Sequence, residues 1–141
     1  MTREQVVQFF EARGAEWAAR DADALAAGHA VAGTVVSPMF GTLRGRSEIA
    51  DSYRRLFASF PDWETKTEDL IVDGGRVAQH FVANATHVGE FMGLAGTNRR
   101  GRIEGVFLHT MDDGAILHEQ RLYDYSALLI QLGVLRSKPA F

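Results

Sequence analysis

Cysteine is absent from the 141 residues, which excludes disulfides, thiol catalysis and thiolate metal sites. Proline is scarce, and no run of roughly 18 apolar residues exists, so a membrane-spanning helix is not expected. The net charge is only −3, which argues against nucleic acid as a partner because phosphate binding needs a basic surface. The chain does contain 46% hydrophobic residues and 14 glycines, which predicts one globular domain over residues 1–141 with many tight turns.

Signals for secretion, metals and cofactors are also missing. Charges at Arg3, Glu4, Glu11 and Arg13 argue against a secretory signal peptide, so a cytoplasmic location is the expectation. Zinc motifs are absent, and the glycines spell neither a dinucleotide fingerprint nor a phosphate-binding loop. We therefore expect no metal and no cofactor.

Helical spacing of apolar residues dominates the first third of the chain. Thr2 followed by Gln5 has the pattern of a capping box that begins a helix. Apolar residues then recur on one helical face, at Val6, Phe9, Phe10 and Trp17. In chain order, this part predicts that first helix, a short helix over 23–27, a strand over 31–40, a turn over 41–45 and a helix over 47–59.

The remainder predicts long strands separated by glycine-containing turns. Residues 73–75 and 112–114 carry hairpin signals, and residues 88–101 form a loop. The expected strands cover 63–72, 76–87, 102–111 and 115–125, and Ser126 begins a short helix over 127–132. Helices first and an antiparallel sheet afterwards favour an α+β fold, in which a curled sheet and the helices on one face enclose a pocket.

Strand alternation predicts which side chains of the two middle strands face that pocket. The odd-numbered residues of both strands are mostly apolar, so Phe81, Phe107 and His109 are expected to point inward. His87 belongs to the same set. Loop lengths then predict the register, with the pairs Met111 and Ile116, His109 and His118, Ile103 and Asp124, Phe81 and His109, and His87 and Ile103.

In the last strand, the even-numbered residues are expected to face inward. This places His118, Gln120 and Asp124 in the pocket, whereas Glu119 and Arg121 face solvent or a partner subunit. A carboxylate on an apolar wall is costly to bury, and desolvation raises its proton affinity toward the range useful for acid–base catalysis. Histidines beside it can donate to a developing enolate oxygen or relay a proton.

Each of these residues also has a purely structural explanation. Asp124 lies two residues before Ser126 and fits a cap of the last helix. His109 and His118 fit a cross-strand core pair, and His87 fits an anchor for the loop after it. The aromatic residues are expected mostly in the core, although some can line a cavity for a flat ligand. His29 and His80 are expected at the surface.

Several short motifs together resemble a known family, and they cover nearly the whole chain. They are Gly45-Arg46, Phe60-Pro61-Asp62, Thr86-His87-Val88-Gly89-Glu90-Phe91 with Gly93, Asp113-Gly114-Ala115-Ile116, Asp124, and Gln131-Leu132-Gly133. In this order they resemble the SnoaL-like polyketide cyclases. The last strand departs from the family pattern, because Gln120 stands where many members have an aromatic residue, and His118 where an acidic residue is common.

The resemblance implies the cone-shaped α+β fold shared with nuclear transport factor 2 and ketosteroid isomerase. It also implies a homodimer or higher oligomer formed through the outer sheet face. Asp124 matches the family's acid/base, which removes a proton beside a carbonyl so that the enolate closes a ring, and His109 and His118 assist.

The expected ligand is a small hydrophobic ketone, and the expected enzyme is a cofactor-free cyclase or isomerase. The residues expected to contact the substrate are His87, Gln120, Phe81, Phe107, Tyr53, Trp63 and Trp17. A non-catalytic protein of the same fold that binds a small hydrophobic ligand is the alternative.

Overall fold

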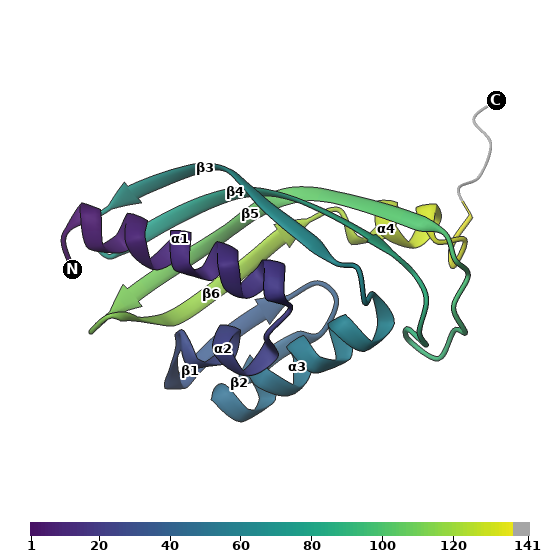
Figure 1. Ribbon diagram of the computed structural model, residues 1–141, viewed down its shortest axis with the longest axis horizontal. Coiled ribbons are helices and arrows are strands. Elements are labelled where there is room, and N and C mark those ends of the chain that lie inside the picture. Colours follow the sequence, from purple (N-terminus) through teal and green to yellow (C-terminus); the bar gives the residue numbers. More distant parts are fainter. Residues whose placement is uncertain (137–141) are drawn as a thin grey trace.

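Residues 1–136 are described by a computed structural model, in which helices pack against a curved, open sheet of six strands (Figure 1). The strand order is β2-β1-β6-β5-β4-β3, and all neighbours are antiparallel except the parallel pair β1–β6. The elements are α1 (Arg3–Ala19), α2 (Ala22–Ala27), β1 (His29–Ser37), β2 (Gly41–Arg44), α3 (Arg46–Ser59), β3 (Glu64–Asp73), β4 (Arg76–Thr86), β5 (Arg100–Asp112), β6 (Ala115–Tyr123) and α4 (Tyr125–Gln131). The predicted α+β fold is confirmed.

Helix α1 begins as predicted. The Thr2 hydroxyl accepts from the Gln5 backbone N–H at 3.2 Å, and the Gln5 side chain accepts from the Thr2 N–H at 2.8 Å, which completes the capping box. The helix lies along β3 and the concave face of the sheet (Figure 1). Its buried residues are Val6, Phe10, Arg13 and Trp17, so an arginine lies in the middle of the apolar stripe.

The region predicted as a strand over 31–40 and a turn over 41–45 is instead a hairpin. Strand β1 ends at Ser37, whose hydroxyl accepts from the backbone N–H groups of Met39 and Phe40 at 3.2 and 3.1 Å. This hydroxyl-stabilised turn reverses the chain. Residues 41–44 therefore form strand β2, which pairs with β1 at the edge of the sheet.

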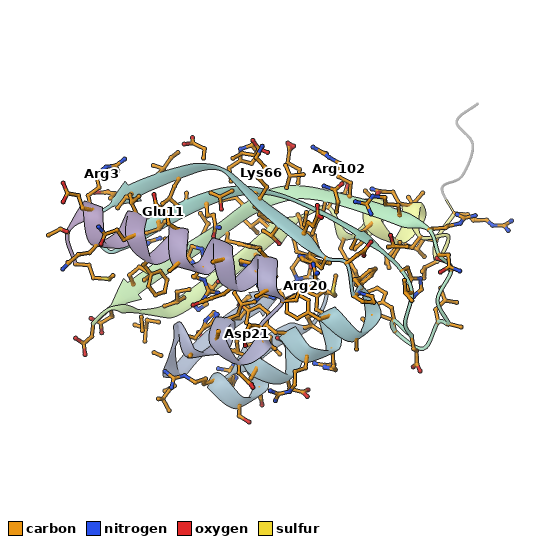
Figure 2. All side chains as sticks on the ribbon, viewed as in Figure 1. Arg3, Glu11, Arg20, Asp21, Lys66 and Arg102 are labelled. Atoms are coloured by element: carbon orange, nitrogen blue, oxygen red, sulfur yellow. The ribbon has the colours of Figure 1, made fainter. Side chains whose placement is uncertain are left out.

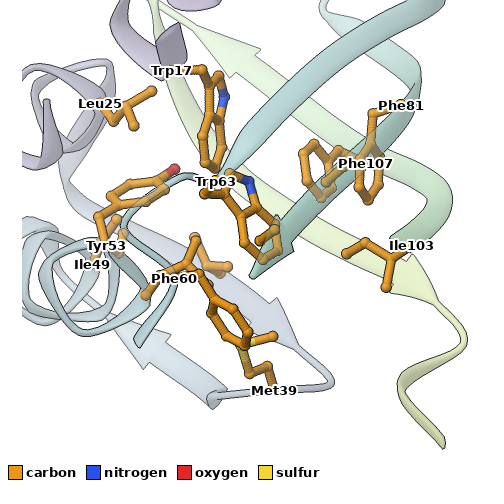
Figure 3. Packing of buried hydrophobic residues seen from close by; sticks show 14 of the residues in the cluster. Trp17, Leu25, Met39, Ile49, Tyr53, Phe60, Trp63, Phe81, Ile103 and Phe107 are labelled. Carbon is orange, nitrogen blue, oxygen red and sulfur yellow. The ribbon is translucent and has the colours of Figure 1, made fainter. Parts of the chain in front are cut away.

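Aromatic rings fill much of the space between the sheet and α1 and α3 (Figure 3). Phe81 and Phe107 stack with ring centroids 4.0 Å apart, and Trp17 meets Tyr53 edge-on at 5.5 Å. Trp63 and Phe60 continue the cluster toward the end of α3. The expectation that the aromatic residues are mostly core is confirmed for these rings.

The middle strands have the predicted inward faces but a different register. Residues Val77, Gln79, Phe81, Ile103, Phe107 and His109 are buried, as predicted. Strand β5, however, begins at Arg100, which already pairs with Thr86. The register is therefore shifted by four residues from the prediction, and Phe81 lies opposite Gly105, not His109.

A bulge in β6 reverses the predicted faces of that strand. Met111 pairs with Ile116 as predicted, but the next pair is Thr110 with His118, which leaves Leu117 unpaired. From His118 onward the odd-numbered residues face inward. The predicted inward orientation of His118, Gln120 and Asp124 is therefore wrong.

Most charged side chains project from the outside of the molecule (Figure 2). Arg3, Lys66 and Arg102 are examples, and each is exposed. Within residues 1–136, no helix is both long and apolar enough to cross a membrane. The charged residues that are buried inside the fold are Arg13, Glu119 and Arg121.

Candidate functional site

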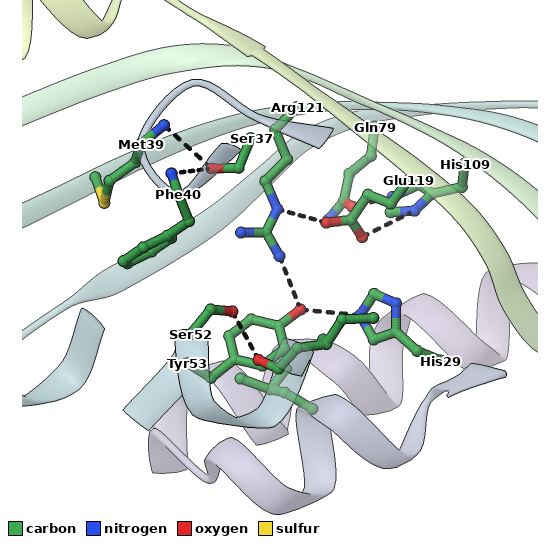
Figure 4. A network of polar contacts seen from close by, with 12 residues as sticks. His29, Ser37, Met39, Phe40, Ser52, Tyr53, Gln79, His109, Glu119 and Arg121 are labelled. Carbon is green, nitrogen blue, oxygen red and sulfur yellow. Dashed lines mark hydrogen bonds and ion pairs between the residues drawn. The ribbon is translucent and has the colours of Figure 1, made fainter. Parts of the chain in front are cut away.

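A buried row of polar side chains crosses the concave face of β4, β5 and β6 (Figure 4). Arg121 donates from Nε to Glu119 Oε2 at 2.6 Å, and His109 Nδ1 lies 3.2 Å from Glu119 Oε1. On its other side, His109 Nε2 lies 2.9 Å from Gln79 Oε1. The Glu119 side chain is only 2% exposed, so this carboxylate is fully enclosed by its partners.

A second polar group, centred on Tyr53 of α3, joins this row from the helical side (Figure 4). The Tyr53 oxygen accepts from Arg13 Nη2 at 3.1 Å and from Arg121 Nη2 at 3.3 Å. His29 Nε2 lies 3.1 Å from the same oxygen. Since both guanidinium groups are donors only, the Tyr53 hydroxyl proton is directed to His29 Nε2, and the His29 ring proton then resides on Nδ1.

Burial and charge pairing shift the pKa of the buried glutamate in opposite directions. Burial alone would raise the pKa of Glu119, but the Arg121 charge and the His109 contact outweigh it and hold this pKa well below its usual value. Burial lowers the pKa of His29 to about 3 and raises that of Tyr53. The centre therefore contains an ionised glutamate, a neutral imidazole and a neutral phenol at neutral pH.

Positive charge exceeds negative charge inside the fold. Arg13 and Arg121 are both buried cations, whereas Glu119 is the one fully buried carboxylate among residues 1–136. Glu16 approaches Arg13 at 3.8 Å but is 31% exposed, so solvent screens part of its charge. Such a surplus favours an anion or an oxygen atom on which negative charge develops.

A small cavity of about 20 Å³, called here the inner cavity, adjoins this centre. Arg121 is its one charged lining residue, and Nη1 of Arg121 has no hydrogen-bond partner among residues 1–136. A volume of this size holds roughly one water molecule, so an organic substrate needs side chains to move. The lining residues are Trp17, Met39, Phe40, Leu56, Trp63, Ile103, Phe107, Arg121 and Tyr123.

Asp124 lies outside this centre. It is exposed, and its carboxylate accepts from the Ala127 backbone N–H at 2.9 Å as the N-cap of α4. Asp124 therefore has the structural role considered above, as the cap of the last helix, and Ser126 does not cap it. Asp124 is not among the residues that line the inner cavity.

Three further predicted residues also lie away from the centre. His118 is half-buried on the outer side of the sheet, where Nδ1 lies 2.7 Å from Thr34 Oγ1, and Gln120 is exposed. His87 is fully buried, but its Nδ1 contacts Thr97 Oγ1 at 3.0 Å and its ring packs on Phe60. His87 therefore fixes the loop that follows β4.

The structure does bring together the other predicted residues. His109 and Tyr53 belong to the polar centre, and Trp17, Trp63 and Phe107 line the inner cavity. The Phe81 ring stacks on the Phe107 ring, which lines the cavity. These residues come from α1, α3, the segment before β3, and strands β4 and β5, so the fold, not the sequence spacing, assembles them.

Gln79 and four ionisable residues of the centre were not predicted as site residues. Glu119 and Arg121 were assigned to the outer face because the bulge in β6 was not foreseen. His29 was expected at the surface but is fully buried. Arg13 did carry a signal, since it follows Phe10 and precedes Trp17 at helical spacing on the apolar face of α1.

The curved sheet and the helices packed against it give this chain the ketosteroid isomerase-like α+β fold. A Catenulispora acidiphila protein with a ketosteroid isomerase-like fold superposes with a TM-score of 0.77 at 23% identity, over 96% of each chain. The family model described as SnoaL-like polyketide cyclase matches residues 4–132. The chain therefore belongs to the SnoaL-like polyketide cyclase family, which confirms the resemblance seen in its motifs.

Two further solved structures are similar to this chain. AclR from Streptomyces galilaeus has 22% identity and a TM-score of 0.83, over 99% of this chain and 91% of that one. IdmH from Streptomyces antibioticus has 26% identity and a TM-score of 0.76, over 91% of this chain and 98% of that one. No curated protein matches the sequence.

Proposed function

We propose that this chain is a cofactor-free enzyme that forms and then quenches an enolate on a ring-shaped ketone. The observation that carries the proposal is the position of Arg121, which borders the apolar inner cavity while bonded to Glu119 and Tyr53. A ketone oxygen in that cavity would meet the unpaired Nη1 of Arg121. Stabilisation of an oxyanion by a fixed donor in a dry site is worth several kcal/mol to a reaction of this kind.

Glu119 is the proposed base, in place of Asp124, because it is the carboxylate beside the cavity-lining arginine. Arg121 keeps Glu119 ionised in the resting enzyme, as a base requires. When Arg121 shares its charge with the substrate oxygen, Glu119 loses part of its stabilisation in a buried site. Its proton affinity then rises toward the range needed to remove a proton beside a carbonyl.

The proposed reaction conserves all atoms. Once side chains around the inner cavity have moved to admit the ketone, Glu119 takes the α-proton, the C–H electron pair forms the enolate, and Arg121 stabilises the negative oxygen. The enolate carbon then either regains a proton, which gives an isomer, or attacks a second carbonyl of the same molecule and closes a ring. In the second case the proton held by Glu119 neutralises the new alkoxide.

Exchange of α-protons tests this proposal without knowledge of the natural substrate. In D2O, the wild-type protein is expected to speed deuterium incorporation into 2-tetralone, measured by proton NMR. Glu119→Gln should lower this rate by about 100-fold or more, since general acid–base catalysis contributes roughly 10²–10⁴-fold. Asp124→Asn is the matched control and should keep the wild-type rate.

The outcomes separate the alternatives. If Asp124→Asn loses exchange and folded Glu119→Gln keeps it, the assignment of the base is wrong. If 2-tetralone binds but the wild-type protein gives no exchange above the buffer rate, the non-catalytic binding protein becomes the better description. Circular dichroism of each variant must match the wild type, because Glu119→Gln also leaves Arg121 without its ion-pair partner.

A further inference from the structure

We propose that the inner cavity is a binding site for one monatomic halide ion, such as chloride, held by Nη1 of Arg121. The halide would lie where the ketone oxygen is placed by the proposed function, so the two ligands compete. The inference rests on the proposed function only for this competition. The site itself follows from an unpaired buried donor, a surplus of buried positive charge and a very small cavity.

The Arg121 side chain is fixed in one orientation by its neighbours. Nε donates to Glu119 Oε2 at 2.6 Å, and Nη2 donates to the Tyr53 oxygen at 3.3 Å. The guanidinium carbon also lies 5.4 Å from the centre of the Tyr53 ring and 5.8 Å from that of Phe107, which are cation–π distances. Arg121 therefore cannot turn Nη1 toward another acceptor without losing these contacts.

Nη1 of Arg121 is the nitrogen that these contacts leave over. Within residues 1–136 no acceptor bonds to it, and Figure 4 shows it pointing away from both Glu119 and Tyr53. Arg121 is only 7% exposed and lines the inner cavity. A buried donor on a charged group is costly to leave unpaired, so a ligand in the cavity that accepts from Nη1 is favoured.

The acceptors closest to Arg121 are already used. Glu119 Oε2 holds Arg121 itself, and Glu119 Oε1 lies 3.2 Å from His109 Nδ1. The Tyr53 oxygen accepts from Arg13 as well as from Arg121. Neither oxygen is therefore available to serve Nη1 as well.

The buried charges favour an anion over a water molecule at this position. Arg13 and Arg121 are buried cations, and Glu119 is the one buried carboxylate within residues 1–136. A water molecule can accept from Nη1 but leaves this surplus unchanged. An anion also balances the charge, in surroundings where solvent screens little of it.

The size and walls of the cavity select the kind of anion. Its volume of about 20 Å³ holds roughly one water molecule, and a chloride ion is only slightly larger. Phosphate, sulfate and carboxylates have several heavy atoms and do not fit. The other lining residues are uncharged and mostly aromatic or aliphatic, so fluoride, the most strongly hydrated halide, would lose most on entering. Chloride and bromide satisfy both conditions.

Two aromatic side chains form the path to this site. Phe40 and Tyr123 are the half-buried lining residues, whereas the rest of the lining is buried. An ion therefore enters past these two rings. A monatomic ion needs a much smaller displacement of them than an organic molecule does.

Tryptophan fluorescence tests the halide site directly. The chain has two tryptophans, Trp17 and Trp63, and both line the inner cavity. Bromide quenches indole fluorescence on contact, whereas chloride and fluoride do not. When sodium bromide replaces sodium fluoride at constant ionic strength, we expect saturable quenching. Added sodium chloride should relieve this quenching, because it competes for the same position.

A substitution that fills the cavity should remove the site. Leu56→Phe leaves Arg121 and its partners in place and should weaken bromide binding by roughly tenfold or more, since a hydrogen bond to a charged group is lost. Leu122→Phe is the matched control, because Leu122 neighbours Arg121 on β6 but is 45% exposed and does not line the cavity. It should leave bromide binding unchanged.

A double variant covers the case in which Leu56→Phe does not fold. Glu119→Leu combined with Arg121→Met replaces the buried ion pair by apolar side chains of similar size, a change that proteins often tolerate. Saturable quenching by bromide should be absent from this protein.

The results distinguish this inference from the proposed function. Quenching of the wild type that never saturates, or equal saturable quenching in folded Leu56→Phe or in the double variant, would overturn the halide site. Bromide binding that Leu56→Phe weakens, without any α-proton exchange in the wild type, would uphold the halide site and refute the enzyme. Exchange without bromide binding would do the reverse. Where both occur, bromide should raise the KM for 2-tetralone and leave kcat unchanged, and an unchanged KM at saturating bromide would overturn the competition.

Discussion

The free energy of unfolding is expected to fall at acid pH, because the hydrogen bonds of the Tyr53 hydroxyl require a neutral His29. Arg13 and Arg121 both donate to the Tyr53 oxygen, so His29 must be neutral to accept the remaining proton. A protonated His29 would lose this role and place a third positive charge beside two arginines. Burial therefore lowers the pKa of His29 in the folded protein from 6.5 to about 3.

The sign and size of the effect follow from proton linkage. Between pH 6.5 and pH 3 the unfolded chain binds a proton at His29 that the folded chain does not, so stability falls as pH falls through this window. At pH 5, about 1.5 pH units below the unfolded pKa, the loss is about 2 kcal/mol relative to pH 8. The stability contributed by ionised Glu119 is lost mainly below pH 4.5, the pKa of this group in the unfolded chain, and therefore outside the range from pH 8 to pH 5.

Urea unfolding of the wild type and of His29→Gln at pH 8 and pH 5 measures this effect. The glutamine oxygen can still accept from Tyr53 but does not titrate. The wild type should lose about 2 kcal/mol more than His29→Gln between the two pH values. Equal losses in the two proteins would refute the neutral, proton-accepting His29 described above.

Three other substitutions test the fold around the centre. Glu119→Gln should lower the free energy of unfolding by about 3 kcal/mol, because Arg121 stays buried without its carboxylate, and urea titration at pH 7 measures it. Asp124→Ala removes the cap of α4 and should cost about 1 kcal/mol; hydrogen exchange of the α4 amides should quicken, and unchanged exchange would contradict the cap. Gly105→Ala should cost about 2 kcal/mol in thermal unfolding, since its β-carbon would overlap the Leu122 carbonyl oxygen, and a neutral result would contradict the tight β5–β6 approach.

Much of the fold could be predicted because its signals are local. The capping box at Thr2, the apolar stripe of α1 and the hairpin signals at residues 73–75 and 112–114 each determine the structure next to them. The inward faces of β4 and β5 followed from alternation alone. The hairpin β1–β2 was missed because its turn depends on the Ser37 hydroxyl, which no composition pattern marks.

The candidate site was harder to predict because one unpaired residue in β6 determines which side chains of that strand face inward. Leu117 at the bulge turns Glu119 and Arg121 inward and His118 and Gln120 outward. Alternation assumes an uninterrupted strand, so it assigned the opposite faces. The homodimer and the cytoplasmic location stay predictions.

The central claim is that Arg121 stabilises negative charge on a ligand oxygen in the inner cavity. Absorbance titration of 2-naphthol bound to the wild-type protein tests it directly, because its phenolate resembles an enolate. The surplus of buried positive charge predicts that the pKa of bound naphthol falls below that of naphthol in water. A pKa that is unchanged or raised on binding would contradict the claim, since an apolar cavity without a working cation would favour the neutral phenol.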